Sequence, residues 1–330
     1  MAKRRVTIIG TGCIGASIGM ALRNSPAAGE LEIVGHDRDS GIAHQAERQG
    51  AFDRTTLLLD PALKDAGMVI VAVPFSEMET VLSDLGRLLE PDSGVVVTDT
   101  APLKAPVLAW ADKLLPPGVH FIGGDPILAP REEVKFPSSV ADAGAELLKE
   151  ALYTITIRPT DAPKAIEGVT NLAQQIGATP LYMDPVEHDG VRLFTRMLPD
   201  LTAVALLRTV MGDSGWEEMR KVASHHFAAG TSAAHGEVAS RRLMAELGRD
   251  SLLRGLDNLV GELQSLRRAI AEGDDESLAA TFHSTAEART VWLHQAQTRD
   301  WEEQGAAPEM PGAMQRTLEM FFGRRKKRGE

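Results

Sequence analysis

Short apolar runs alternate with segments of helical periodicity along the first half of the chain. The runs are rich in β-branched residues, as buried strands are, and they lie at residues 6–9, 31–35, 55–59, 67–73, 94–98, 120–122, 154–157 and 180–183. Helical patterns separate them at residues 40–49, 76–89, 102–115 and 161–176, with Ser76 as a cap and Pro102 in a first turn. This alternation predicts an α/β fold built on a doubly wound, mainly parallel sheet.

From about Glu187 the strand pattern stops, and leucines recur at spacings of three and four. The stripe consists of Leu252, Leu253, Leu256, Leu259, Val260, Leu263, Leu266 and Ile270. This spacing predicts a long amphipathic helix that Asp250 or Ser251 caps and Gly273 ends, followed by a second helix that Asp274 or Asp275 opens. We therefore expect a sheet domain over residues 1–186 and an all-helical C-terminal domain over residues 187–323. Because the helical part has few other core elements, its stripes are expected to reach a second copy, giving a homodimer.

Composition narrows the classes of protein further. The 330 residues are 43% hydrophobic and 25% charged, as in ordinary globular proteins, and they leave room for two domains. A single cysteine excludes a disulfide framework and a cysteine-rich metal site. The net charge of −11 argues against nucleic-acid binding, although residues 324–328 form a basic run within the tail 324–330, which could bind nucleic acid or an anionic surface. We expect that run to be a disordered tail.

The N-terminus superficially resembles a signal peptide, because Lys3-Arg4-Arg5 precede an uncharged run that reaches Leu22. Four glycines interrupt that run, which an apolar signal core would not favour. No apolar run elsewhere is long enough to span a bilayer. The sequence therefore predicts a cytoplasmic protein with no membrane partner.

The first apolar run leads directly into a glycine motif, Gly10-x-Gly12-x-x-Gly15, which a small-residue helix follows. In this pattern the first glycine allows a tight turn, the second lets a pyrophosphate approach the backbone, and the third lets the helix pack closely on the strand. The helix N-terminus offers free N–H groups and a positive dipole end to the phosphates. The strand before the motif and the helix after it predict a dinucleotide-binding Rossmann domain.

The next strand ends at Asp37, twenty-two positions past Gly15, where a carboxylate can accept hydrogen bonds from the ribose hydroxyls of an adenosine. Arg38 could hold the extra phosphate of NADP, but Asp37 would repel it. NAD is therefore the predicted cofactor, with NADP as the alternative. The remaining predicted cofactor contacts lie in the glycine loop and beyond the ends of later strands: Thr11, Cys13, Ile14, Val73, Pro74 and Thr100.

Taken in order, several segments resemble the prephenate/arogenate dehydrogenase family over most of the chain. They are residues 10–19, 71–76, 97–104, 121–126, 188–189, 198–199 and the helical pair from residue 266 to residue 289. The resemblance implies a dinucleotide-binding domain followed by a helical dimerisation domain. It also implies a reaction on the route to tyrosine, an oxidative decarboxylation. A hydride leaves the hydroxyl-bearing ring carbon of prephenate or arogenate for the cofactor, and carbon dioxide is lost.

The chain departs from that family's pattern at the positions that carry the chemistry. Pro102 stands where the family has a serine, and Asp125 stands where the family has its catalytic histidine. A proton acceptor is needed at that place, and a carboxylate can serve, so Asp125 is the predicted catalytic residue. The alternative is a loop carboxylate without a catalytic role.

The second half departs from the family as well. The segment Thr195–Asp200 lacks both histidines of the family's motif, and Ala228 occupies the place of the arginine that holds a substrate carboxylate. Arg192 or Arg196 is predicted to replace that arginine. The neighbours His188 and Asp189, like the pair His225-His226, contain atoms that could bind a metal, but no zinc-type spacing supports a metal site.

The sequence thus predicts an NAD-dependent oxidoreductase resembling prephenate/arogenate dehydrogenase, acting on a small-molecule substrate. Because the serine, the histidine and the arginine are all replaced, two alternatives stay open. One is a dehydrogenase on the same scaffold that acts on a different hydroxy acid. The other is a dinucleotide-binding protein that has lost catalysis.

Overall fold

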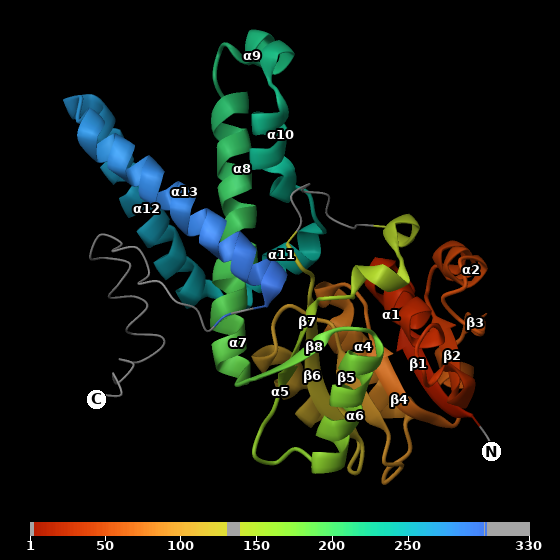
Figure 1. Cartoon of the computed structure of the whole chain (residues 1–330). Coiled ribbons are helices and arrows are strands. Elements are labelled where there is room, and N and C mark those ends of the chain that lie inside the picture. The colour runs from red at the N-terminus through yellow and green to blue at the C-terminus, as the bar shows by residue number, and fades with distance from the viewer. Residues whose placement is uncertain (1–2, 131–138, 300, 302–330) are drawn as a thin grey trace. The chain divides into compact units, whose positions relative to one another are not determined.

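The computed structural model describes residues 3–130, 139–299 and 301 of the chain (Figure 1). The chain divides into two compact units, residues 1–257 and residues 258–330. The basic run within residues 324–330, which was predicted to form a disordered tail, lies outside the described residues.

An eight-stranded sheet forms the centre of the first unit, in the order β3-β2-β1-β4-β5-β6-β7-β8. Its strands are β1 Arg4–Ile9, β2 Leu31–His36, β3 Arg54–Thr56, β4 Ala66–Val71, β5 Val96–Asp99, β6 His120–Ile127, β7 Leu152–Thr156 and β8 Thr179–Met183. Neighbouring strands are parallel except β6 and β7, which are antiparallel. The predicted doubly wound, mainly parallel sheet is confirmed. Because β2 and β4 flank β1 on opposite sides, the strand order reverses there and opens a crevice at the carboxyl ends.

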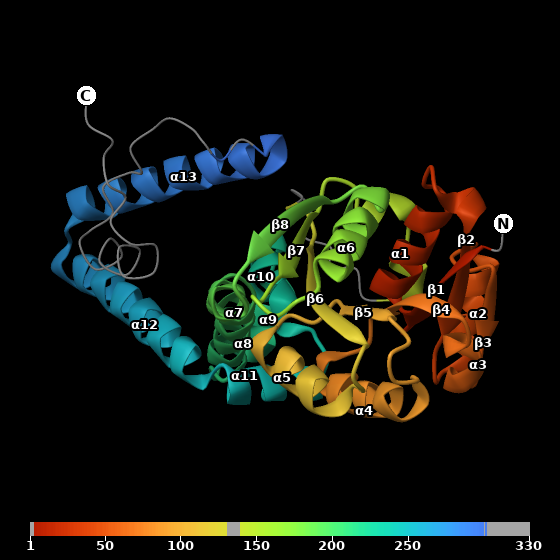
Figure 2. The same ribbon diagram turned by 90° about the horizontal axis from the view of Figure 1, so that it is seen from below.

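Helices cover both faces of this sheet (Figure 2). On one face lie α1 Cys13–Arg23, α2 Ser40–Arg48 and α6 Pro163–Gln175, and on the other α3 Leu59–Leu63, α4 Met78–Leu88 and α5 Ala105–Leu114. Successive strand residues point to opposite faces, so Ile8 packs in one core cluster and Ile9 in the other. This explains why the central strands are apolar throughout.

Three local predictions in the sheet domain are wrong. The run at residues 55–59 is not one strand: β3 ends at Thr56, and α3 begins at Leu59. Pro61 explains the change, because proline breaks a strand ladder and is tolerated in the first turn of a helix. Likewise Pro102 precedes α5, whose first turn holds Pro106 instead.

Ser76 is the third. Its hydroxyl donates to Glu237 at 3.1 Å, its N–H donates to the hydroxyl of Ser240 at 3.1 Å, and α4 begins two residues later without a side-chain cap. The residue predicted to cap a local helix therefore connects the segment after β4 to α11, far along the chain.

After β8 the described chain contains no further strand. Its helices are α7 Pro185–Arg192, α8 Leu198–Met211, α9 Trp216–Val222, α10 His225–Thr231, α11 Val238–Leu247, α12 Arg249–Glu272 and α13 Asp275–Thr298, with a π-helical turn, η5 Leu193–Met197, between α7 and α8. Short 3₁₀ turns are η1 Ala28–Glu30, η2 Phe75–Glu77, η3 Val140–Asp142, η4 Ala145–Leu147 and η6 Ser232–Ala234. No helix of the described residues combines the length and the apolarity needed to cross a membrane.

The predicted leucine-stripe helix is α12. Gly273, with φ +68°, ends it as predicted, and the Asp274 side chain caps α13 by accepting the Ser277 N–H at 3.0 Å. The predicted start is wrong, because α12 already begins at Arg249 and places Asp250 and Ser251 inside its first turn. Several apolar side chains of the two helices are about half exposed or more: Leu253, Val260, Leu263, Ile270, Phe282, Val291 and Trp292.

Candidate active site

The three glycines of the opening motif have distinct surroundings. Gly10 adopts φ +92°, and a Cβ atom there would lie 2.3 Å from the carbonyl oxygen of Ala72. A Cβ atom at Gly15 would lie 1.9 Å from the carbonyl oxygen of Gly10. A Cβ atom at Gly12, in contrast, would have no neighbour within 4 Å. Gly10 and Gly15 are thus required by packing within the protein, whereas Gly12 borders open space at the start of α1.

The N-terminus of α1 offers unused hydrogen-bond donors to that space. Gly12 is the residue before the helix, no side chain caps it, and among the described residues the amides of Cys13 and Ile14 have no acceptor. Free amides at the positive end of a helix fit a phosphate group. The thiol of Cys13 is buried and burial raises its pKa, so Cys13 can serve through its backbone.

Asp37 stands directly after β2 beside this loop. Its carboxylate accepts hydrogen bonds from the Thr11 N–H at 2.8 Å, from the Thr11 hydroxyl at 3.1 Å and from the Asp39 N–H at 2.9 Å. These three bonds fix the carboxylate while leaving a lone pair of Oδ1 for a ribose hydroxyl. Arg38 is exposed and forms an ion pair with Glu77 at 3.0 Å.

The other predicted cofactor residues meet at the same edge of the sheet. Val73 and Pro74 follow β4, and Thr100 follows β5, with its N–H donating to Val71 at 3.1 Å. The structure therefore brings the predicted cofactor residues together along the carboxyl ends of β1, β2, β4 and β5, where a dinucleotide fits.

Lys104 and Asp99 form a buried ion pair at the same edge of the sheet, where β5 ends. The Lys104 ammonium lies 2.5 Å from Asp99 and 2.5 Å from the carbonyl oxygen of Gly124, and both charged side chains are fully buried. Asp99 also accepts the N–H groups of Ala101 and Gly124. Burial raises the pKa of the Asp99 carboxyl, and Lys104 offsets only part of that rise. The pair ties the ends of β5 and β6 together.

Asp125, the predicted catalytic residue, is buried on β6 and faces two side chains of α7. Its Oδ2 atom lies 2.7 Å from Arg192 Nε and 3.2 Å from His188 Nε2. Burial raises the pKa of the Asp125 carboxyl, but Arg192 and His188 outweigh burial and hold that pKa well below its usual value. Asp125 is therefore ionised, with Arg192 and His188 beside one of its oxygens, so it is a weak base.

The sequence of α7 explains this arrangement. Asp184 caps the helix by accepting two N–H groups, and Pro185 occupies its first turn. His188 and Arg192 are four residues apart and so project from one face, toward β6. Arg196, a further four residues along, lies on the π-helical turn η5, a feature that is frequent at functional sites.

The two predicted substrate-binding arginines differ in their surroundings. Arg192 forms an ion pair with Asp125, with its Nε atom 2.7 Å from Oδ2 but outside hydrogen-bond geometry, and its terminal nitrogens have no hydrogen bond among the described residues. Arg196 is exposed, and within the described part of the chain it forms no ion pair; the carboxylates of Asp125 and Asp200 act on it electrostatically. Both guanidinium groups can therefore bind an anion near Asp125.

Sequence reasoning missed the roles of His188 and Asp189. The Asp189 carboxylate accepts the N–H groups of Lys104 at 2.5 Å and Ala105 at 2.9 Å, and it lies 3.1 Å from Nδ1 of His188. Asp189 thus caps α5 from another helix, and His188 lies between two carboxylates. The one signal in the sequence was a histidine–aspartate pair in the first helix after the last strand.

Other candidates lie apart from this cluster. His225 and His226 stack with ring centroids 4.0 Å apart on the exposed helix α10, which also carries Ala228. Among the described residues no group of three or more potential metal ligands occurs.

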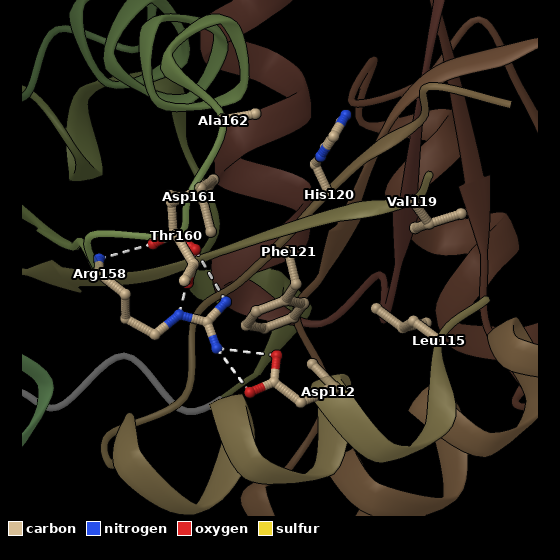
Figure 3. A pocket seen from close by; sticks show the side chains of 11 residues that line it. Asp112, Leu115, Val119, His120, Phe121, Arg158, Thr160, Asp161 and Ala162 are labelled. Carbon is tan, nitrogen blue, oxygen red and sulfur yellow. Dashed lines mark hydrogen bonds and ion pairs between the residues drawn. The ribbon is translucent and has the colours of Figure 1, made fainter. Parts of the chain in front are cut away.

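A pocket at the opposite end of β6 is lined by His120, Phe121 and Arg158 (Figure 3). The Arg158 guanidinium already binds Asp112 and Asp161. Because its charge is paired and Asp125 lies at the other end of the strand, we do not assign this pocket to the active site.

Comparison with known proteins identifies relatives along most of the chain. Residues 18–182, half of its length, match the family model described as prephenate dehydrogenase, nucleotide-binding domain. The chain is 27% identical over 293 residues to a prephenate dehydrogenase of Bacillus subtilis (strain 168), covering 87% of this chain and 76% of that protein. It is 27% identical over 292 residues to a cyclohexadienyl dehydrogenase of Zymomonas mobilis subsp. mobilis, covering 87% and 95%.

A solved structure has the same fold. The prephenate dehydrogenase from A. aeolicus, in complex with hydroxyphenyl propionate and NAD+, superposes with a TM-score of 0.76 at 22% identity. The superposition covers 88% of this chain and 98% of that one. The sheet domain and the helices that follow it therefore share one architecture with that structure.

Proposed function

The chain belongs to the family of the prephenate dehydrogenase nucleotide-binding domain, and we propose that it is an NAD-dependent dehydrogenase that oxidises prephenate or arogenate. The observation that carries the proposal is the open N-terminus of α1, with its unused amides, at the same sheet edge as the buried Asp125 cluster. A dinucleotide-binding site suits hydride transfer when it lies beside groups that can bind a hydroxyl, such as Asp125, and a carboxylate, such as Arg192 and Arg196. The names of the two curated relatives and the ligands of the A. aeolicus structure support it.

The cofactor that fits this site is NAD, which supplies the hydride acceptor when bound. The amides at Gly12, Cys13 and Ile14 would hold its pyrophosphate, and the fixed carboxylate of Asp37 would accept from a ribose hydroxyl. A 2′-phosphate would meet the charge of Asp37, and Arg38, the cation that could hold such a phosphate, is paired with Glu77.

The Asp37→Ala variant should lose affinity for NAD, because its ribose would lose a charge-assisted acceptor worth about 2 kcal/mol, which is roughly thirtyfold in Kd. The Kd for NADP should change much less, because the lost hydrogen bond is offset by lost repulsion. Titration calorimetry with both dinucleotides measures the ratio. Asp39→Asn is the matched control, since the Asp39 side chain caps α2 by accepting the N–H groups of Gly41 and Ile42. An unchanged ratio in Asp37→Ala would contradict the ribose assignment.

The substrate side of the proposal rests on charge. Prephenate and arogenate carry carboxylates, and Arg196 together with the terminal nitrogens of Arg192 would bind one of them. The Oδ1 atom of Asp125, which has no partner among the described residues, would accept a hydrogen bond from the ring hydroxyl, since Oδ2 already lies against Arg192 and His188. A carboxylate that stays ionised orients that hydroxyl while the carbon beneath it gives up its hydride.

Production of NADH tests the function directly. Purified protein supplied with NAD should form NADH from prephenate or arogenate, and Arg196→Gln should raise KM at least tenfold, the loss expected for one charge-assisted bond of about 1.5 kcal/mol. Arg208→Gln, on the neighbouring helix α8, is the matched control. Tight NAD binding without turnover of either substrate would contradict the proposed reaction.

We further propose that the chain forms a homodimer through its last two helices. Val260, Leu263 and Ile270 of α12 are 48%, 56% and 66% exposed in the single chain, and Phe282 and Trp292 of α13 are similarly open. Several large apolar side chains exposed on two consecutive helices favour an interaction surface, and a second copy offers the same side chains in return. Light scattering at micromolar concentration should give twice the chain mass, and Leu263→Glu should shift it to the monomer. A monomeric mass for the unaltered chain would refute the dimer.

A further inference from the structure

A chain of short contacts runs from the N-terminus of α5 to Arg192 through three side chains. Asp189 accepts two amides of α5, His188 lies 3.1 Å from Asp189 through Nδ1 and 3.2 Å from Asp125 through Nε2, and Arg192 contacts Asp125. Resting on the proposed function, we propose that His188 takes up the proton of the substrate hydroxyl and returns it to the product. In this arrangement Asp125 touches the hydroxyl, and Asp189 is the positioning residue for the imidazole.

The separate roles of Asp125 and His188 follow from the different surroundings of the two Asp125 oxygens. Oδ2 is shared by Arg192 and His188, whereas Oδ1 has no hydrogen-bond partner among the described residues. A hydroxyl bonded at Oδ1 is therefore one carboxylate away from His188. The neighbouring Arg192 guanidinium holds the pKa of the Asp125 carboxyl low, so a proton delivered to it does not stay there. The imidazole of His188 lies 3.2 Å from the Oδ2 atom of the same carboxylate and is the next group that can take up that proton.

Asp189 sets the orientation that this transfer needs. Because two backbone amides of α5 hold its carboxylate, Asp189 presents a fixed acceptor to His188 Nδ1, and we assign the Nδ1–H to it. The neutral imidazole then turns the lone pair of Nε2 toward Asp125 Oδ2. Two lone pairs facing each other at 3.2 Å repel, and a proton placed between them turns that repulsion into a hydrogen bond.

Each carboxylate that faces the imidazole has a partner of its own. Asp125, from β6, is paired with Arg192, and Asp189, beside the imidazole on α7, is bound to the positive end of α5. Lys104, which lies close enough to act on Asp125, is neutralised by the buried Asp99, and Arg196 approaches from η5. No carboxylate beside His188 is therefore left unpaired, and the imidazole is the group that takes up the substrate proton in this proposal.

The hydroxyl proton stays within the site throughout the reaction. When the ring carbon gives its hydride to the nicotinamide, the hydroxyl proton passes through Asp125 to His188, and the carbon–oxygen bond becomes a carbonyl. When the carbon–carbon bond to the departing carbon dioxide breaks, its electron pair enters the ring and the carbonyl oxygen becomes a phenolate. His188 then returns the proton to that oxygen, so the cycle consumes no further reactant.

His188→Gln tests the proposal, because glutamine can hydrogen-bond Asp125 but cannot titrate. We expect kcat to fall roughly a hundredfold, in the range of general acid–base catalysis, with the acidic limb of the kcat/KM pH profile flattened and Kd for NAD unchanged. Asp189→Asn should shift that limb to another pH while keeping it, which a purely structural role would not do. His120→Gln, at the other end of β6, is the matched control and should match the wild type. A His188→Gln enzyme with wild-type kcat and pH profile would overturn the proposal.

A second measurement separates this inference from the proposed function. Nitrogen-15 NMR of the NAD-bound protein should show one imidazole, absent from His188→Gln, that changes protonation between pH 5 and 8, and Asp125→Asn should shift its titration. If no NADH forms from either substrate, the proposed function fails while the NMR titration still decides the inference. An imidazole that keeps one protonation state across that range would overturn it in either case.

Discussion

Gly12→Ala should fold like the wild type and bind NAD roughly thirtyfold more weakly, because displacing the pyrophosphate from the α1 amides loses about 2 kcal/mol of charge-assisted hydrogen bonding. The new methyl group meets no protein atom within 4 Å, and Gly12 has φ −64°, which alanine adopts freely. The methyl group would occupy the space through which the phosphates approach the helix. Calorimetric Kd for NAD together with the thermal midpoint of unfolding separates binding from folding.

Two other glycines give the contrast that this experiment needs. Gly29 in η1 is equally open, with no neighbour within 4 Å of its Cβ position, so Gly29→Ala should change neither quantity. Gly15→Ala places its Cβ atom 1.9 Å from the Gly10 carbonyl oxygen, and it should lower stability by about 1–3 kcal/mol through overpacking. Equal NAD affinity in Gly12→Ala and wild type would contradict the location of the phosphates.

Lys104→Met should lower the free energy of unfolding by about 3–5 kcal/mol, since it leaves the carboxylate of Asp99 buried without its cation. The exposed pair of Arg87 and Asp84 is the control, and Arg87→Met should cost less than about 1 kcal/mol. The double variant Asp99→Asn/Lys104→Met should regain part of the loss, because no unpaired charge remains. Denaturant unfolding measures all three, and a loss in Lys104→Met no larger than in Arg87→Met would contradict the role of the pair.

The pH dependence of that variant has a definite sign. Burial raises the pKa of Asp99, and removal of Lys104 takes away what offsets the rise, so the folded pKa moves further above the unfolded one. A carboxyl with a raised folded pKa stabilises the fold only while it is protonated, and that stability is lost as pH rises through the folded pKa. The deficit of Lys104→Met should therefore shrink as the pH falls, and a deficit independent of pH would exclude an ionised Asp99 as its cause.

The sequence alone predicted the sheet that carries the cofactor residues, because the signals for that sheet are local. The apolar runs and the spacing from Gly10 to Gly15 act within one strand–turn–helix unit, and the confirmed sheet follows from them. The direction of β7 against β6 was not predictable in this way, since an apolar run has the same pattern in either direction. The prediction that Ser76 caps a local helix was wrong for a similar reason, because the partners of Ser76, Glu237 and Ser240, lie far along the chain.

The substrate half depends on contacts that no local pattern contains. Asp125 was singled out from its position in a motif, but its chemistry is set by His188 and Arg192, more than sixty positions later. A histidine next to an aspartate suggested metal ligands, whereas in the fold each faces a different partner of the sheet domain. Charge pairing, which decides whether Arg192, Arg196 or Asp125 is free to bind substrate, becomes visible only in three dimensions.

The cap that Asp189 places on α5 bears on how this protein can be dissected. The predicted boundary at residue 186 would leave Asp189 on the helical fragment and expose two amides of α5 on the other. The compact unit extends to residue 257, so a shortened chain meant to isolate the cofactor seat should end there. For the same reason, a chimera that exchanges the helical part between relatives should take residues 104, 105 and 189 from the same parent protein.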